Sequence, residues 1–123
     1  MLTFAAFLAG CAGQPSFTDQ PGAFFATFEG KFPPADVVSV SDCVFDGFEL
    51  AQGKWSDVVT RKTTRATGYR VEARIGPFQA LIAEIKDSGE LALLRTTHWN
   101  RANTDKEEAA AKACLVKYAA PAN

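Results

Sequence analysis

Residues 68–75 read Gly-Tyr-Arg-Val-Glu-Ala-Arg-Ile, and this stretch decides the fold. Apolar and charged side chains alternate along it, which is the two-residue period of a strand with one buried face. Turn sequences such as Gly-Pro and Asp-Ser-Gly separate it from segments of similar character. Those segments are residues 57–63, 79–86 and 90–99. We therefore expect an antiparallel meander of four strands.

A helix is indicated on either side of these strands. Within residues 35–52, apolar side chains recur at the three- and four-residue spacing of an amphipathic helix. Thr104 and Glu107 have the spacing of a capping box, and an alanine-rich helix is predicted at residues 105–119. The sequence thus predicts one α+β domain at residues 35–119, with a four-stranded antiparallel sheet and both helices packed on one of its faces.

The composition fits a single globular domain. Of the 123 residues, 47% are hydrophobic and 22% are charged, which separates this chain from disordered sequences. The formal net charge is -1, so no overall positive field draws the protein to nucleic acid. We expect no nucleic-acid partner.

The N-terminal segment has the character of an export signal. Residues 1–11 form an apolar run without a charge that is too short to span a bilayer and ends in Leu8-Ala9-Gly10-Cys11. This ending resembles the bacterial lipobox. The resemblance implies that residues 1–11 are a lipoprotein signal segment, that Cys11 carries the lipid (a palmitate-type anchor), and that the protein is held on the periplasmic side of the cell envelope. Ala12 follows in place of an Asp, which implies the outer membrane. The alternative is a buried N-terminal strand or helix with an incidental cysteine.

Residues 12–34 are predicted to be a linker and an aromatic-rich N-terminal extension. The first half contains two Pro and two Gly, which is linker composition. The second half concentrates four phenylalanines at positions 24, 25, 28 and 32. We expect these rings to dock on the core as a turn or short helix, with a partner-facing or membrane-facing patch as the alternative.

The remaining two cysteines form a natural pair. If Cys11 is lipidated, Cys43 and Cys114 are left in a compartment where disulfides persist, and we expect them to be bonded to each other. The alternative is two free buried thiols in a cytosolic protein.

The pattern is similar to that of a group of small lipoproteins from bacteria and their phages. The shared features are Cys43 in an early helix, Trp55 soon after, Gly68-Tyr69 at the start of a strand and Cys114 in the last helix. The resemblance covers residues 35–115. It implies a fold and a compartment, and it implies no activity.

Residues that signal catalysis are sparse. His98 is the only histidine, and neither a nucleophile elbow nor a phosphate-binding glycine loop is present in the sequence. We expect no catalytic residue, cofactor or metal site. Glu84 interrupts an apolar strand, and the simpler interpretation is an ion pair with a basic residue of the sheet.

A basic sheet face is the most coherent candidate binding surface. Its residues are Arg70, Arg74, Arg95, His98 and Trp99. Arginine forks suit carboxylates and phosphates, so this surface would fit an acidic protein, a peptidoglycan carboxylate or a lipid phosphate. The alternative is a solvated face balanced by its own acids, with His98 and Trp99 packed in the core or at its rim.

Together these features indicate a small membrane-anchored envelope lipoprotein that is a non-enzymatic binding or accessory module. Its partner would be an envelope protein or peptidoglycan. Two other hypotheses remain: a periplasmic hydrolase that uses His98, and a toxin-immunity or phage-exclusion lipoprotein.

Overall fold

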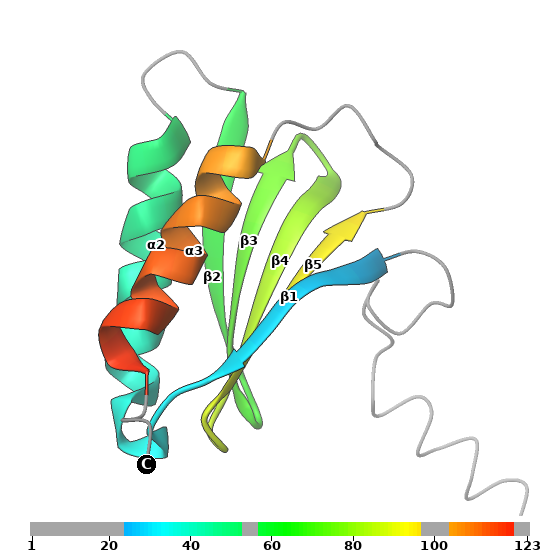
Figure 1. Cartoon of the computed structure of the whole chain (residues 1–123). Helices are drawn as coiled ribbons and strands as arrows, with labels where there is room; N and C mark the ends of the chain where they lie inside the picture. The colour runs from blue at the N-terminus through cyan, green and yellow to red at the C-terminus, as the bar shows by residue number, and fades with distance from the viewer. Residues whose placement is uncertain (1–23, 53–56, 97–103, 120–123) are drawn as a thin grey trace, which may run out of the picture.

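The computed structural model describes residues 24–52, 57–96 and 104–119 (Figure 1). These residues form one antiparallel sheet with the strand order β1-β5-β4-β3-β2, together with two α-helices and a short 3-10 helix. The elements are β1 (Phe24–Lys31), η2 (Pro34–Asp36), α2 (Val37–Gln52), β2 (Val58–Arg65), β3 (Gly68–Ile75), β4 (Phe78–Lys86), β5 (Glu90–Thr96) and α3 (Asp105–Tyr118). The protein therefore has the α+β class that the sequence indicates.

The prediction of a four-stranded sheet is wrong, because the sheet has five strands. The additional strand, β1, lies in the aromatic-rich segment for which a turn or short helix was expected. It pairs with β5 along its length, from Phe24 opposite Thr96 to Lys31 opposite Glu90. Phenylalanine and threonine favour strands, but the long-range pairing that makes this segment a strand has no local sequence signal.

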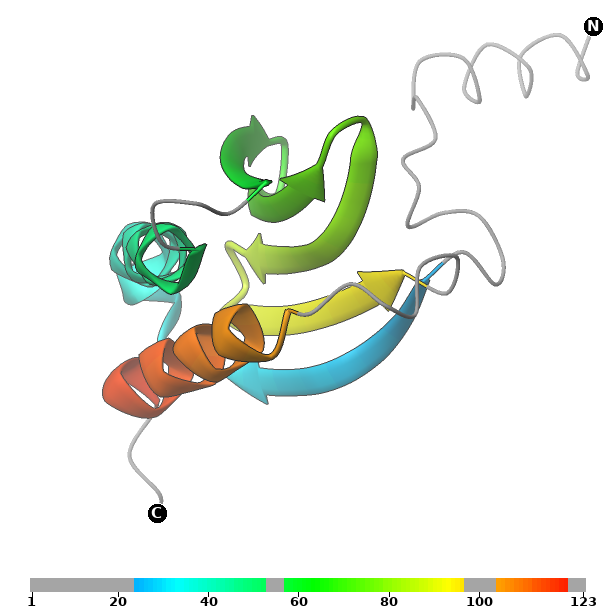
Figure 2. The same cartoon turned by 90° about the horizontal axis from the view of Figure 1, so that it is seen from above.

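Both helices cover the same face of the sheet, and Figure 2 shows them together on one side of the strands. Core side chains of α2 recur at Val40, Val44 and Phe48, one turn apart. They pack against inward-facing side chains of the central strands, which include Val71, Ala73, Leu81, Ala83, Ile85, Leu91 and Leu93. Neither α-helix of the described segments is long and apolar enough to cross a membrane.

The two helices run in opposite directions and approach each other closely at Gly47 (Figure 1). A Cβ atom at Gly47 would lie 2.9 Å from the Cβ of Ala110, which is closer than carbon atoms pack. Gly30 of β1 similarly leaves room for the side chain of Leu115. Both glycines are therefore needed where α3 meets its neighbours, which offsets the helix-propensity cost of about 1 kcal/mol at Gly47.

The predicted disulfide is confirmed. Cys43 of α2 and Cys114 of α3 are bonded, with their Cα atoms 5.9 Å apart, and the bond spans 71 residues of sequence. In the chain-entropy description, closing a loop of this length stabilises the folded state by about 4 kcal/mol. For a domain of this size, that is a large part of the total stability.

We predict that replacing both cysteines (Cys43→Ala with Cys114→Ala) lowers the free energy of unfolding by about 2–5 kcal/mol. Denaturant unfolding of the unchanged and doubly substituted proteins measures the difference. A reductant should lower the free energy of unfolding of the unchanged protein by a similar amount and should leave that of the double variant unchanged. Equal sensitivity of both proteins to the reductant would contradict this role of the bond.

Candidate binding surface

The side of the sheet opposite the two helices, here called the open face, is lined by charged side chains of the central strands. Val71 and Ala73 point into the core, so the alternating residues Arg70, Glu72 and Arg74 point to the open face. The open face also carries apolar side chains, and Ile82 of β4 is buried there. It is therefore a mixed surface, and its charges are set among apolar neighbours.

Arg70 and Glu84 form an ion pair in the middle of the open face. They are directly opposite each other on β3 and β4, and the Nε atom of Arg70 donates to Oε1 of Glu84. Only 6% of the Arg70 side chain and 20% of the Glu84 side chain are exposed. Glu84, which interrupts the apolar strand predicted at residues 79–86, is thus paired with Arg70 of the neighbouring strand, and both groups are largely withdrawn from water.

A second charged cluster surrounds Glu72. The Nη1 atom of Arg74 donates to Oε2 of Glu72 at 2.9 Å, and the side-chain amide of Gln79 donates to the same oxygen. The other terminal nitrogen of Arg74 donates to the backbone oxygen of Pro77 at 3.0 Å. Arg74 is therefore occupied by bonds within the protein.

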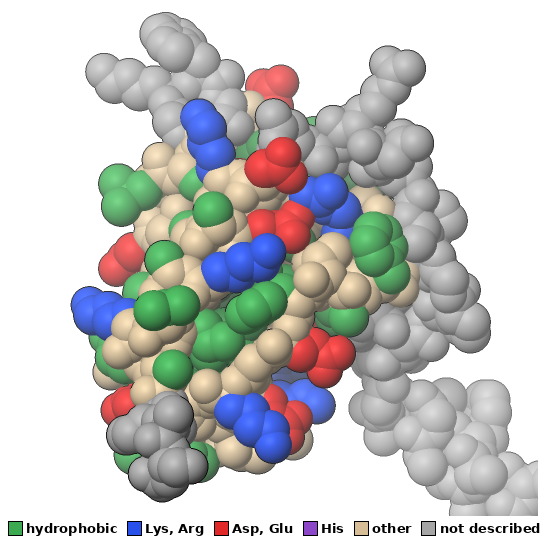
Figure 3. Space-filling model, in the orientation of Figure 1, with side chains coloured by type: hydrophobic (Ala, Val, Ile, Leu, Met, Phe, Trp, Pro, Cys, Tyr) green, Lys and Arg blue, Asp and Glu red, His purple; other side chains and the backbone are tan. Residues whose placement is uncertain are grey.

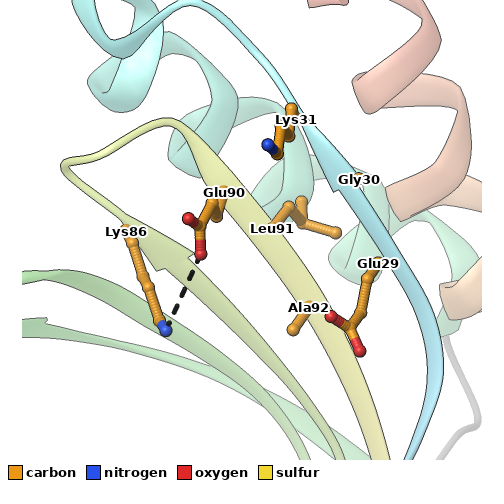
Figure 4. A pocket seen from close by; sticks show the side chains of 7 residues that line it. All are labelled: Glu29, Gly30, Lys31, Lys86, Glu90, Leu91 and Ala92. Atoms are coloured by element: carbon orange, nitrogen blue, oxygen red, sulfur yellow. Dashed lines mark ion pairs between the residues drawn. The ribbon is translucent and has the colours of Figure 1, made fainter.

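One exposed part of the open face lies where β1 and β4 end and β5 begins. A pocket of about 310 Å³ is present there, lined by Glu29, Gly30, Lys31, Lys86, Glu90, Leu91 and Ala92 (Figure 4). Lys86 and Glu90 reach toward each other, with 3.9 Å between Nζ and Oε1, and about half of each side chain is exposed. Glu29 and Lys31 add one more charge of each sign. This arrangement, here called the charged pocket, suits a ligand that carries both a carboxylate and an ammonium group.

Arg95 lies on the opposite side of the sheet from Arg70 and Arg74. It shares the strand face of Leu91 and Leu93, which belong to the core under the helices. Its Nη2 atom donates at 3.0 Å both to Thr104 Oγ1 and to Asp105 Oδ1, and it also bonds Glu108. Arg95 therefore joins β5 to the first turn of α3 and contributes nothing to the open face.

The first turn of α3 differs from the expected capping box. The hydroxyl group of Thr104 makes no capping bond to a backbone N–H and instead accepts a hydrogen bond from Arg95. Its position at the start of α3 is as predicted, but its partner comes from a strand.

His98 and Trp99 lie outside the described residues. The hydrolase hypothesis depends on His98 and is therefore not tested by the structure. Among the residues that are described, no group of three or more His, Cys, Asp or Glu side chains is placed to hold a metal ion. Of the surface predicted from Arg70, Arg74, Arg95, His98 and Trp99, the described residues place Arg70 and Arg74 on the open face and Arg95 on the side of the helices, whereas His98 and Trp99 stay a prediction.

Sequence analysis did not identify Glu29 and Lys31 as residues of the site. Both belong to β1, and they were assigned to an extension outside the sheet. Once β1 is recognised as a strand, their two-residue spacing places them together on one face. The sequence signal was the run of β-favouring residues before the two prolines at 33 and 34.

The carboxyl group of Glu107 on α3 is the clearest case of a shifted pKa. Burial raises the pKa of Glu107 above its ordinary value of 4.5, and its own backbone N–H and Lys106 oppose the shift more weakly. Glu107 does not line the charged pocket. The raised pKa therefore bears on the stability of the fold. The buried side chain favours its neutral, protonated form, so the folded state has the full contribution of Glu107 below about pH 4.5 and loses it as the pH rises through the raised pKa.

We predict that Glu107→Gln raises the thermal midpoint at pH 7 and changes it little below pH 4.5, because the substitution removes the cost of ionising a buried carboxyl group. Midpoints measured between pH 3 and pH 8 test this. Glu49→Gln, at an exposed position on α2, is the matched control and should leave the profile unchanged. A destabilisation by Glu107→Gln at every pH would show that the carboxylate is favourable in the fold.

Comparisons with known proteins do not restrict the function. No protein-family model matches the chain, and neither a curated protein nor a solved structure is detectably similar to it. The proposals that follow therefore depend on the chemistry of the described side chains and on the sequence.

Proposed function

We propose that the protein is a lipid-anchored, non-enzymatic binding module on the periplasmic side of the outer membrane. Its charged pocket receives a short peptide-like ligand with both charges, such as the stem peptide of peptidoglycan. The observation that carries this proposal is the difference between the two faces of the sheet. One face is buried in the core under the helices, whereas the other presents exposed charges of both signs on a rigid sheet.

The scaffold supports a role in binding. Cross-strand pairing fixes the backbones of β1, β5 and β4, from which the four charged side chains of the pocket project. A preorganised surface loses less conformational entropy when a ligand binds.

The disulfide supports the envelope location. Such bonds persist in the periplasm and on cell surfaces and are rare in the reducing cytosol. The Cys43–Cys114 bond uses both cysteines of the described residues, so Cys11 is the thiol that remains for lipid attachment. This agrees with the resemblance of Leu8-Ala9-Gly10-Cys11 to a lipobox.

The pocket is tested by reversing its two positive charges. We predict that Lys31→Glu with Lys86→Glu weakens co-sedimentation with purified peptidoglycan sacculi by about tenfold or more, because a hydrogen bond to a charged group contributes about 1.5 kcal/mol. Lys106→Glu with Lys117→Glu, on α3, makes the same change in net charge and should have little effect. Failure of the unchanged protein to sediment with sacculi, or equal loss in both variants, would refute the ligand assignment.

The anchor is tested separately. We predict that Cys11→Ser abolishes labelling by a palmitate analogue, since the lipid is attached through the thiol of this cysteine. Cys43→Ser with Cys114→Ser is the control and should keep the label, even though it removes the disulfide. Labelling that persists in the Cys11→Ser protein would exclude the anchor and leave the pocket experiment unaffected.

A further inference from the structure

A groove between α2 and α3 opens on the side of the helices that points away from the sheet. Its volume is about 560 Å³, and it is called the helix groove below. The core residues of α2 point toward the sheet, so the exposed residues that line the groove point outward. The lining includes Asp42, Asp46 and Leu50 on the α2 wall, and Ala110, Ala113 and Lys117 on the α3 wall.

The helix groove combines a floor of small side chains with an exposed leucine. Gly47 and Ala110 meet at the floor, and the Cys43–Cys114 bond lines it as well. Leu50 on the α2 wall is 85% exposed, which is the largest value among the large hydrophobic side chains of the described residues. Figure 3, in which α3 lies toward the viewer, shows hydrophobic side chains over this helix interspersed with charged ones. Apolar contact area surrounded by charges is the composition of a protein interface.

The two walls of the helix groove carry opposite charges. The charged residues of α2 are Asp42, Asp46 and Glu49, so this helix has three acids and no base. On the α3 wall the charge is positive. Lys117 lines the groove, and Lys106 precedes Ala110 by four residues, which places it on the same side of α3.

These charges are available to a partner. Asp42 is bonded to Lys62, but 61% of the Asp42 side chain remains exposed. Lys117 lies over the ring of its neighbour Tyr118 and is exposed. Within the described parts of the chain, no ion pair is formed by Asp46, Glu49, Lys106 or Lys117.

A second copy of this chain has the chemistry that fits the helix groove. When two copies are related by a two-fold axis along the groove, α2 of each copy faces α3 of the other, and acids meet lysines twice. A two-fold axis across the helices would instead place α2 on α2, with acids facing acids. We propose that the protein forms a symmetric dimer through the helix groove, with α2 of one copy packed on α3 of the other.

The register between the helices brings the opposite charges to one level. Gly47 lies beside Ala110, and Cys43 is bonded to Cys114. By this register Asp42 is two residues from the level of Lys117, which is about 3 Å along a helix. A two-fold axis along the groove keeps each residue at its level, so Asp42 of one copy reaches Lys117 of the other, and the two Leu50 side chains meet near the axis. The same symmetry keeps the first strands of both copies at one end, which suits two lipid anchors in one membrane.

The apolar contact is tested by the association of the full chain in solution, with Cys11→Ser in every sample so that no lipid contributes. We expect sedimentation equilibrium to show a concentration-dependent dimer. Leu50→Asp should raise its dissociation constant about tenfold or more, because the symmetry removes the contact of two leucines. Val59→Asp, at an exposed position of β2, is the matched control and should associate like the unchanged protein. A protein that stays monomeric up to about 1 mM, or an equal effect of both substitutions, would overturn the dimer.

The arrangement of the helices is tested by exchanging the charges. One variant carries Asp42→Lys with Asp46→Lys, and the other carries Lys106→Glu with Lys117→Glu. Each variant alone should associate several-fold more weakly, because like charges then face each other. An equimolar mixture should recover the affinity of the unchanged protein, since the α2 lysines of one variant meet the α3 acids of the other. A mixture that associates no better than the separate variants would overturn the pairing of α2 with α3.

Two controls make these results specific. Asp57→Lys with Asp87→Lys makes the same change in net charge outside both helices and should leave the dimer unchanged. Far-ultraviolet circular dichroism confirms the fold of each variant, and Asp46→Lys alone replaces an α2 variant that does not fold. The sacculi assay of the charged pocket uses protein diluted until it is monomeric. Sacculi binding by a protein that never dimerises therefore overturns the dimer alone, and a dimer that does not bind sacculi refutes the ligand alone.

Discussion

The attachment of α3 depends on the contact between the two helices. α3 packs chiefly against α2, and it is fixed there by the Cys43–Cys114 bond and by the close approach at Gly47. Its sequence is alanine-rich, so its own apolar surface is small and supplies limited burial energy. The covalent bond compensates for this, because it holds Cys114 next to Cys43 in the unfolded chain as well and so reduces the conformational entropy gained on unfolding. Its links to the sheet include Arg95 at the first turn, Leu115 over Gly30 and Lys112 over the ring of Phe28.

The open face depends on a different interaction, the pairing of largely desolvated charges. Removing one partner of a buried ion pair leaves a charge without compensation, at a cost of about 3–5 kcal/mol, although the intact pair adds little net stability. Arg70–Glu84 is close to this limit, whereas Lys86–Glu90 is half exposed and contributes less. The inner pair therefore favours one register between β3 and β4, because slipping the strands would separate the charges. The outer charges remain available to a ligand.

Much of this architecture follows from local sequence patterns, and the exceptions have physical causes. The alternation at residues 68–75 and the helical periodicity before Gln52 act within a few residues, so they are readable without a structure. The position of Arg95 was also readable, since it has the parity of Leu91 and Leu93. β1 was missed because its partner β5 begins almost sixty residues after β1 ends, and edge strands lack a clean alternation. Because β1 was missed, Glu29 and Lys31 were missed as well, and these are two of the four charged side chains of the charged pocket. Thr104 illustrates the reverse error: the local pattern marks the start of α3, but the hydroxyl group makes no capping bond and accepts a hydrogen bond from Arg95 of β5.

The charged pocket lies at the end of β1 that is farther from the N-terminal segment of the chain. β1 begins at Phe24 and ends at Lys31 in the charged pocket, and eight residues of strand span about 25 Å. With the proposed lipid on Cys11, this length separates the charged pocket from the point at which residues 12–23 join the domain. An anchor of this kind raises the effective concentration of the charged pocket near the membrane, so even a weak site for peptidoglycan peptides becomes effective there.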